Sequence, residues 1–242
     1  DLTNDRIVGA EALVRWQLSD GTFRYPNEFI PLFEQNGFCH KLDMYMVEQV
    51  CKQLRSWIDE GLTPIPISIN QSKLLFANAN YPDELIKITN KYDIPPSLIT
   101  LEMLEGIATN DTQQINSQIE ALHAKGFKIS MDDFGSGYSS LNMLYCLKID
   151  ELKLDRGFMR EVSDKDDNRR RRIVLKEIIT FAKKLNISTV AEGIETQQDK
   201  EYVAALHCDY GQGYFYAKPM SAYDFSQKYM YTDHSEAMQD EV

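Results

Sequence analysis

The sequence lacks the features that mark several protein classes. No apolar run approaches the ~20 residues that a membrane-spanning helix needs. Lys and Arg number 26 against 37 Asp and Glu, which gives a formal net charge of −11. An acidic chain has no general affinity for the nucleic-acid backbone. We therefore expect no membrane contact by this segment and no DNA or RNA duplex as a partner.

Cysteines are few and widely spaced. The chain has four, Cys39, Cys51, Cys146 and Cys208, and none forms a Cys-x-x-Cys pair. Scattered cysteines in a chain of this length indicate reduced, buried thiols in the cytoplasm rather than disulfides or a thiolate metal site.

Low-complexity linkers and targeting signals are also absent. No Gly/Ser-rich segment divides the 242 residues, which predicts a single domain over residues 1–230. Residues 231–242 have no apolar periodicity, and we expect them to form a loose tail. The chain opens on "DLTN", without an initiator Met or a signal-peptide pattern, so we expect it to be a fragment of a longer protein.

What the sequence does contain is a regular alternation of strand-like and helix-like segments. Apolar positions recur at three and four residues over 43–60, 112–125 and 168–185, as in amphipathic helices. Strand-like runs occupy residues 8–16, 66–70, 99–103, 127–132, 151–155, 188–192 and 209–215. This order predicts parallel strands covered by helices. Seven strands are one short of a (β/α)₈ barrel, and we expect the first strand to be missing or truncated at the N-terminus.

Polar side chains close nearly every predicted strand. In a parallel barrel the carboxyl ends of the strands meet at one rim, where the chemistry is found. The polar residues at or near those ends are Glu11, Arg15, Asn70, Glu102, Asp132, Asp133, Lys153, Glu192 and Gln212. So many carboxylates would repel one another unless cations lay between them. Oxygen ligands of this kind suit Mg²⁺ or Mn²⁺.

The pair Asp132-Asp133 needs a special backbone. Successive strand residues point to opposite faces, so both side chains reach one centre only where the strand stops or bends. Gly135 and Gly137 follow directly and supply conformational freedom. Two carboxylates at such a bend can serve two metal ions, an arrangement that suits the displacement of a phosphoester oxygen.

With these residues in place, the sequence resembles the EAL-domain phosphodiesterases, which hydrolyse cyclic di-GMP. The resemblance covers nearly the whole chain and begins with the namesake tripeptide Glu11-Ala12-Leu13. The motifs follow in family order: "GAEALVRW", "NEFIPLFEQNG", "SINQSKLL", "LEMLEG", "DDFGSGYSSL", "IDELKLDRGFM", "VAEGIET" and "GQGYFYAKPM". The implied fold is the EAL variant of the TIM-type barrel.

The resemblance implies a role for each matching residue. The implied ligands of two ions, Mg²⁺ or Mn²⁺, are Glu11, Asn70, Glu102, Asp132, Asp133 and Glu192. Lys153 matches the lysine that positions the attacking water, and Glu192 is also the candidate general base, with Asp133 beside them. The implied reaction is attack of a metal-bound hydroxide on one phosphodiester, giving linear pGpG.

Four more residues match the family's pocket. Arg15, Glu195 and Gln212 correspond to substrate-binding positions, and Glu105 corresponds to the glutamate that supports the loop after Asp133. Leu104 departs from the pattern, because the family usually has Thr between the two glutamates of "EMLE". The Tyr-Gln-Pro-like motif of the family's first strand is absent, in line with the missing strand.

Simpler interpretations of the same residues stay open. Lys153 could be a structural ion-pair partner of Asp132 or Asp133, and Arg15 could pair with Glu11. At the level of function, the domain could be an inactive cyclic di-GMP receptor or scaffold. The barrel alone would also allow a Mg²⁺-dependent lyase or isomerase that uses Lys153 as a base.

The resemblance also bears on partners. Beyond cyclic di-GMP, it implies a homodimer and further domains in the full-length protein, of a sensor or cyclase-like kind. We expect the domain to face the cytoplasm, where the full-length protein can be tethered to the inner face of the membrane.

Overall fold

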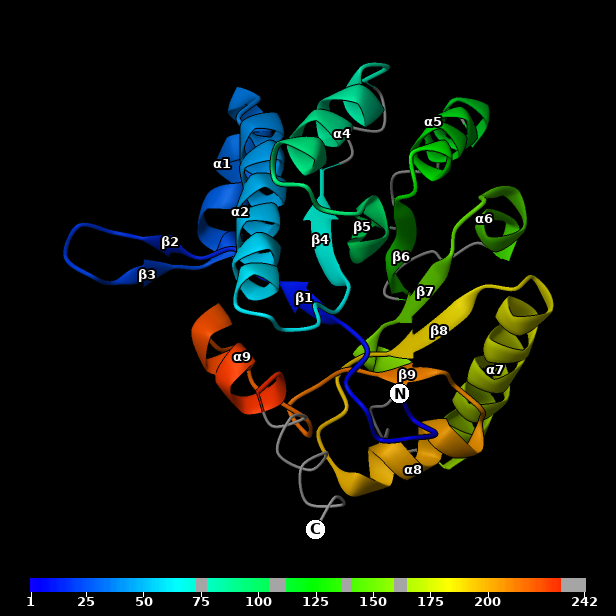
Figure 1. The fold of residues 1–242 in the computed structure, drawn as a ribbon. Coiled ribbons are helices and arrows are strands. Elements are labelled where there is room, and N and C mark those ends of the chain that lie inside the picture. The colour runs from blue at the N-terminus through cyan, green and yellow to red at the C-terminus, as the bar shows by residue number, and fades with distance from the viewer. Residues whose placement is uncertain (73–77, 105–111, 136–140, 159–164, 232–242) are drawn as a thin grey trace, which may run out of the picture. The chain divides into compact units, whose positions relative to one another are not determined.

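The seven predicted strands are present in the computed structural model, which describes residues 1–72, 78–104, 112–135, 141–158 and 165–231 (Figure 1). They form one sheet in the order β1-β4-β5-β6-β7-β8-β9. The bounds are β1 (Ala10–Ala12), β4 (Ile67–Gln71), β5 (Ile99–Leu104), β6 (Lys128–Phe134), β7 (Glu151–Leu154), β8 (Ser188–Ala191) and β9 (Tyr210–Gly211). The pairs β1–β4, β6–β7, β7–β8 and β8–β9 are parallel, as predicted.

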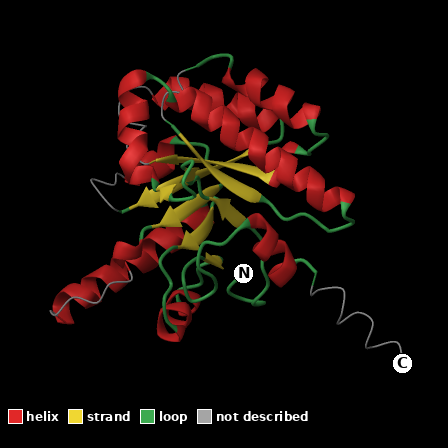
Figure 2. Cartoon of the chain, turned by 90° about the vertical axis from the view of Figure 1, so that its left-hand side faces the viewer, coloured by secondary structure: helices red, strands yellow, loops and turns green. Residues whose placement is uncertain are grey.

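Helices follow the strands along the chain, and Figure 2 shows the helices in red and the strands in yellow. Their bounds are α1 (Pro26–Asn36), α2 (Cys39–Asp59), α4 (Tyr81–Lys91), α5 (Thr112–Ala124), α6 (Leu141–Cys146), α7 (Lys165–Lys184), α8 (Gln197–Ala205) and α9 (Ala222–Tyr229), with 3₁₀ turns at η1 (Pro96–Leu98) and η3 (Arg156–Phe158). The helices α2, α5 and α7 confirm the three predicted from apolar periodicity.

The chain divides into two compact units. Unit 1 comprises residues 1–8, 102–123 and 128–218, and unit 2 comprises residues 9–101, 124–127 and 219–242. The single domain over residues 1–230 stays a prediction, and the predicted tail lies outside the described residues from 232 onward. Within the described residues, no helix is both long and apolar enough to cross a membrane.

In unit 2, β1 and β4 pack against α2. Ala10 pairs with Ile67 and Ala12 with Ile69. The helix α2 buries a stripe with helical spacing that includes Val47, Leu54 and Trp57. Burial of such side chains contributes ~1.5–3 kcal/mol each. The stripe also contains one carboxylate, Asp43.

The predicted strand over residues 8–16 is wrong in its second half. The chain leaves the sheet after Ala12 and forms a separate antiparallel hairpin of β2 (Trp16–Gln17) and β3 (Phe23–Arg24) (Figure 1). The Trp16 ring packs edge-on against Phe29, with 5.7 Å between ring centroids. Aromatic packing therefore removes Trp16 from the sheet and redirects the chain.

In unit 1, β6 to β9 carry the core, and α7 packs against β8. Leu152 and Leu154 of β7 are fully buried, as is Leu175 of α7. The loops after β8 and β9 interlock through their backbones, because Ile194 N donates to the Gln212 carbonyl and Phe215 N donates to the Ile194 carbonyl, at 3.1 and 2.9 Å. A Cβ on Gly213 would lie 2.1 Å from the Ile194 carbonyl oxygen, so only glycine permits this approach.

Candidate active site

Lys153 is the centre of a buried ionic cluster in unit 1. Its Nζ lies 2.8 Å from Glu192 Oε1, 3.0 Å from Glu102 Oε1 and 3.1 Å from Asp132 Oδ1. The lysine side chain is 2% exposed. The carboxylates come from β5, β6 and the residue that follows β8. Lys153 thus joins the ends of three strands around one ammonium group.

Burial makes the charge balance of this cluster important. An isolated buried ammonium is unfavourable unless it is paired and hydrogen-bonded. Three carboxylates more than balance one lysine, so an excess of negative charge remains. A bound cation would offset that excess, which the lysine alone does not do.

The strand β6 bends at Asp133. Asp133 has a φ of 56°, in the left-handed region, and the pairing of β6 with β7 shifts register between Met131 and Phe134. This confirms the predicted bend and places it at Asp133 itself rather than after it. Aspartate tolerates the left-handed region better than most residues. Gly135 also has a positive φ, 98°, and Gly137 lies outside the described residues.

The bend brings both aspartates to the same centre. One carboxylate oxygen each from Asp132, Asp133 and Glu192 lies within 4.8 Å of the others. Asp132 Oδ1 also accepts a hydrogen bond from Asp133 N at 2.9 Å. The donors are hard oxygens without nitrogen or sulfur, which is the set that Mg²⁺ and Mn²⁺ prefer. These residues therefore fit a divalent cation.

Two more of the predicted ligands meet in unit 2. Asn70, near the end of β4, donates from Nδ2 to Glu11 Oε1 of β1 at 2.7 Å. The two oxygen-bearing side chains thus come together across adjacent parallel strands, as expected for residues at one strand end.

The predicted substrate-binding residues lie at loops and strand ends. In unit 2, the Arg15 guanidinium donates to the Val14 carbonyl at 2.8 Å and lies 5.3 Å above the centre of the Tyr25 ring. In unit 1, Glu195 is exposed before α8. Gln212 follows β9, and its backbone N donates to the Ala191 carbonyl at 2.8 Å.

Of the last two positions of the "EMLE" motif, the structure describes only the first. Leu104, where the family usually has Thr, is the last residue of β5 and is 49% exposed. Glu105, the predicted loop support, lies outside the described residues.

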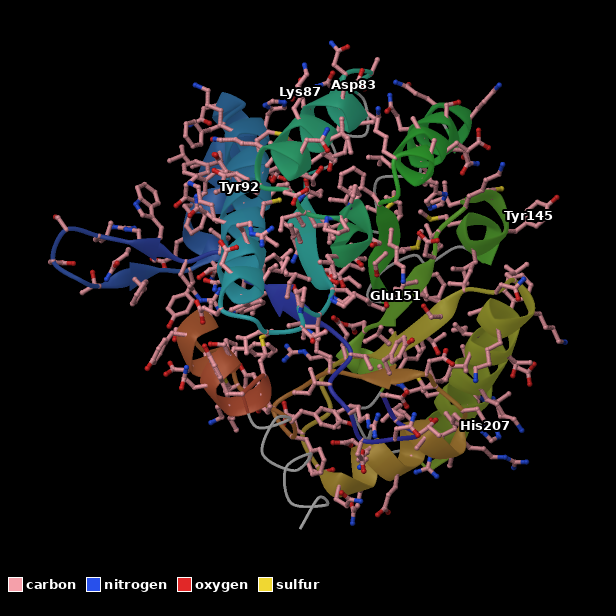
Figure 3. The ribbon with its side chains drawn as sticks, viewed as in Figure 1. Asp83, Lys87, Tyr92, Tyr145, Glu151 and His207 are labelled. Carbon is pink, nitrogen blue, oxygen red and sulfur yellow. The ribbon has the colours of Figure 1, made fainter. Side chains whose placement is uncertain are left out.

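A half-buried carboxyl lies on the same strand as Lys153. Glu151 precedes Lys153 by two residues on β7, pairs in register with Ser130 of β6, and is labelled in Figure 3. Burial raises the pKa of Glu151, with hydrogen bonding to Ser130 and the positive charge of Lys153 acting in the opposite direction. The sequence pattern did not single it out, although a Glu-x-Lys spacing in a strand places both side chains on one face.

Comparison with known proteins agrees with this architecture. The parallel strands carry acidic residues at their ends with a buried lysine among them, which defines an α/β domain with a candidate active site at the strand ends. Residues 1–219 match the EAL domain family. The chain belongs to that family, and its fold is the EAL variant of the (β/α)₈ barrel without the first strand.

Named relatives come from several bacteria. The chain is 35% identical over 219 residues to the bifunctional diguanylate cyclase/cyclic di-GMP phosphodiesterase MucR of Pseudomonas aeruginosa, covering 90% of this chain and 32% of MucR. It is also 35% identical over 224 residues to the probable cyclic di-GMP phosphodiesterase PdeB of Escherichia coli, covering 93% of this chain and 42% of PdeB. The chain therefore spans a third to two fifths of the length of these relatives.

A solved structure shows the same fold. The MucR phosphodiesterase in complex with cyclic di-GMP superposes with a TM-score of 0.83 at 35% identity, over 92% of this chain and 89% of the solved one.

Proposed function

We propose that this domain hydrolyses cyclic di-GMP to linear pGpG and requires divalent cations, Mg²⁺ or Mn²⁺, two of them in the complete site. The observation that carries the proposal is the convergence of Glu102, Asp132 and Glu192 on Lys153. Relatives at 35% identity that bear the name of cyclic di-GMP phosphodiesterase support the choice of substrate.

The side chains that would hold the ions fall into two groups. In unit 1 these are Glu102, Asp132, Asp133 and Glu192, and in unit 2 they are Glu11 with the Asn70 amide oxygen. When bound, the ions lower the pKa of coordinated water and neutralise phosphate charge. Asp132 and Asp133 are adjacent at a bend, so both side chains would be available to hold an ion.

The side chains of the cluster supply the remaining chemistry. Lys153 would turn one of its three N–H groups from a carboxylate to the attacking water and so orient it. Glu192, 2.8 Å from Lys153, accepts the proton of that water. A bond forms between the water oxygen and phosphorus, the bond from phosphorus to the 3′ oxygen breaks, and solvent protonates the departing oxygen. One cut of the ring leaves the 5′ phosphate on linear pGpG.

Residues in loops and at strand ends would recognise the substrate. Arg15 would contact a phosphate of cyclic di-GMP, because its planar guanidinium matches two phosphate oxygens. Glu195 and Gln212 would contact the substrate from the loops after β8 and β9. Glu105 would support the loop that follows Asp133.

We expect a homodimer, with sensor or cyclase-like domains in the full-length protein, and a site that faces the cytoplasm. Cyclic di-GMP is the expected small-molecule partner, and bound cations would offset the repulsion between its phosphates and the acidic chain.

The test is a hydrolysis assay. The domain is incubated with cyclic di-GMP in Mg²⁺, in Mn²⁺ and in excess chelator, and products are separated by chromatography. We expect pGpG with either metal, none with chelator, and none from Glu11→Ala or Glu102→Gln. Tight binding of cyclic di-GMP without turnover in either metal would make the domain a receptor instead, and lack of both would overturn the proposal.

A further inference from the structure

A buried polar network lies behind Asn70 in unit 2. It consists of Asp43 from α2, Gln71 at the end of β4, Ser72 just after it, and Tyr81 at the start of α4. Asp43 is 7% exposed, Gln71 is buried, and Tyr81 is fully buried. Buried polar groups destabilise a fold unless hydrogen bonds satisfy them. Two hydrogen bonds of this network reach the backbone at the end of β4.

Asp43 binds the backbone at the point where β4 ends. Its Oδ2 accepts a hydrogen bond from Ser72 N at 3.0 Å. The strand ends at Gln71, so the next N–H needs an acceptor from another part of the chain. Asp43 supplies that acceptor from the apolar stripe of α2, where a hydrophobic side chain would otherwise be expected.

Gln71 and Tyr81 hold the backbone carbonyl of Asn70. The Tyr81 hydroxyl donates to Gln71 Oε1 at 2.8 Å, and Gln71 Nε2 donates to the Asn70 carbonyl at 2.9 Å. The Asn70 carbonyl and the Ser72 N–H, both on the C-terminal side of Asn70, are thus each tied to a buried side chain. Asn70 itself is exposed and turns its amide toward Glu11. Because the Asn70 side chain is exposed, the position of its backbone determines where the side chain points.

We propose that Asp43 is a positioning residue, which fixes the end of β4 so that Asn70 and Glu11 present their oxygens to a divalent cation. The inference rests on the proposed function, because it concerns the same metal site. Groups that orient metal ligands from behind typically change affinity by ~10–100-fold when they are replaced. Asp43 belongs to this class although it lies 27 residues before Asn70 in the sequence.

The test measures Mn²⁺ affinity directly, by electron paramagnetic resonance of free Mn²⁺ in titrations of the intact domain. Asp43→Leu keeps the shape and removes the acceptor, and we expect its affinity to fall ~10-fold or more. Asp43→Asn keeps an acceptor oxygen, and we expect affinity within about threefold of wild type. Turnover of Asp43→Leu at saturating Mn²⁺ should return toward the wild-type value, because the catalytic groups of unit 1 are unchanged.

Two further variants separate positioning from stability. Tyr81→Phe removes a single oxygen from the network and should also weaken Mn²⁺ binding. Asp150→Ala is the matched control, because Asp150 accepts from Ile129 N at 2.7 Å, near the amino end of β6. We expect it to lower the melting temperature and leave Mn²⁺ affinity within about threefold.

The outcomes are distinguishable. If the wild type binds Mn²⁺ and hydrolyses cyclic di-GMP while Asp43→Leu and Tyr81→Phe bind Mn²⁺ as tightly as wild type, the positioning inference is wrong and the proposed function stands. If Asp150→Ala weakens Mn²⁺ binding as much as Asp43→Leu does, general destabilisation explains the effect and the inference is also wrong. If the wild type itself neither binds Mn²⁺ nor turns over substrate, both the function and the inference fall.

Discussion

The Lys153 ammonium and the Glu192 carboxylate lie 2.8 Å apart, between β7 and the end of the adjacent strand β8. The lysine is 2% exposed. The sheet fixes the relative position of Lys153 and Glu192, because Lys153 lies on β7 and Glu192 directly follows the paired strand β8. A general base and a water-orienting cation would thereby be fixed before substrate arrives.

Replacing Lys153 by Met should separate stability from catalysis. Met has a similar length and no charge, so the three carboxylates lose their internal cation. Breaking a buried ionic cluster from one side costs ~3–5 kcal/mol, and we expect the free energy of unfolding in chelator to fall by about that amount. Hydrolysis should be lost. Saturating Mg²⁺ should restore part of the stability, which thermal melts with and without the ion would show. A variant as stable as wild type in chelator would contradict the ionic account.

Asp133 offers a test of the bend in β6. Both Asp133→Asn and Asp133→Ala remove the carboxylate, so both should weaken metal binding and turnover. Only Asn tolerates the left-handed conformation well, whereas Ala at a φ of 56° is strained by ~1–2 kcal/mol. We therefore expect urea unfolding of the Ala variant to occur at lower denaturant, with the Asn variant close to wild type. Equal stability of the two would show that the bend is not under this constraint.

The buried Asp43 predicts a pH dependence of stability. Burial raises the pKa of Asp43, and hydrogen bonds from Ser72 oppose the shift. The folded state therefore holds the proton more tightly than the unfolded chain. Stability falls as the pH rises from the ordinary value near 4 through the raised one, by about 1.4 kcal/mol for each pH unit of that window.

Asparagine does not titrate, so Asp43→Asn should gain stability relative to wild type across the same window. Urea unfolding in chelator between about pH 4 and pH 8 measures the difference. A difference that stays constant with pH would mean that the folded pKa of Asp43 is not raised.

The thiols provide a chemical test of the core. Burial raises the pKa of Cys51 to about 12 and also raises the pKa of Cys39 and Cys208. Cys146 is only half-buried. A thiol reagent at mildly alkaline pH should therefore modify Cys146 quickly and the other three only after unfolding, with Cys146→Ser as the control. Fast modification of a second thiol in the native domain would contradict the packing around α2 and β9.

Much of the fold could be predicted because its signals are local. Each of the seven strands is a short apolar run between amphipathic helices, and parallel pairing follows from that order. The hairpin of β2 and β3 was missed because "EALVRW" has the pattern of one continuous strand. Its break depends on Trp16 contacting Phe29, a contact that no local pattern reveals.

For the site, the sequence predicted which residues take part but not how they contact one another. Acidic residues at strand ends were visible as a set, because strand ends meet at one edge of a parallel sheet. Their individual contacts were not, and the three carboxylates around Lys153 emerge only from the structure. Asp43 was missed because an acid near the start of a helix normally faces solvent. Its partner, Ser72, lies 29 residues away, and a carboxylate within the apolar stripe of α2 is the signal that could have revealed it.

The central claim is that carboxylates from separate strands share divalent cations and act on a cyclic dinucleotide. A crystal of the domain grown with Mn²⁺ and cyclic di-GMP, with anomalous scattering recorded at the manganese edge, tests it most directly. The account predicts two manganese peaks beside a substrate phosphate, bound by oxygen atoms of the predicted ligand side chains. If no manganese lies within coordination distance of these side chains while cyclic di-GMP is bound, the account is wrong.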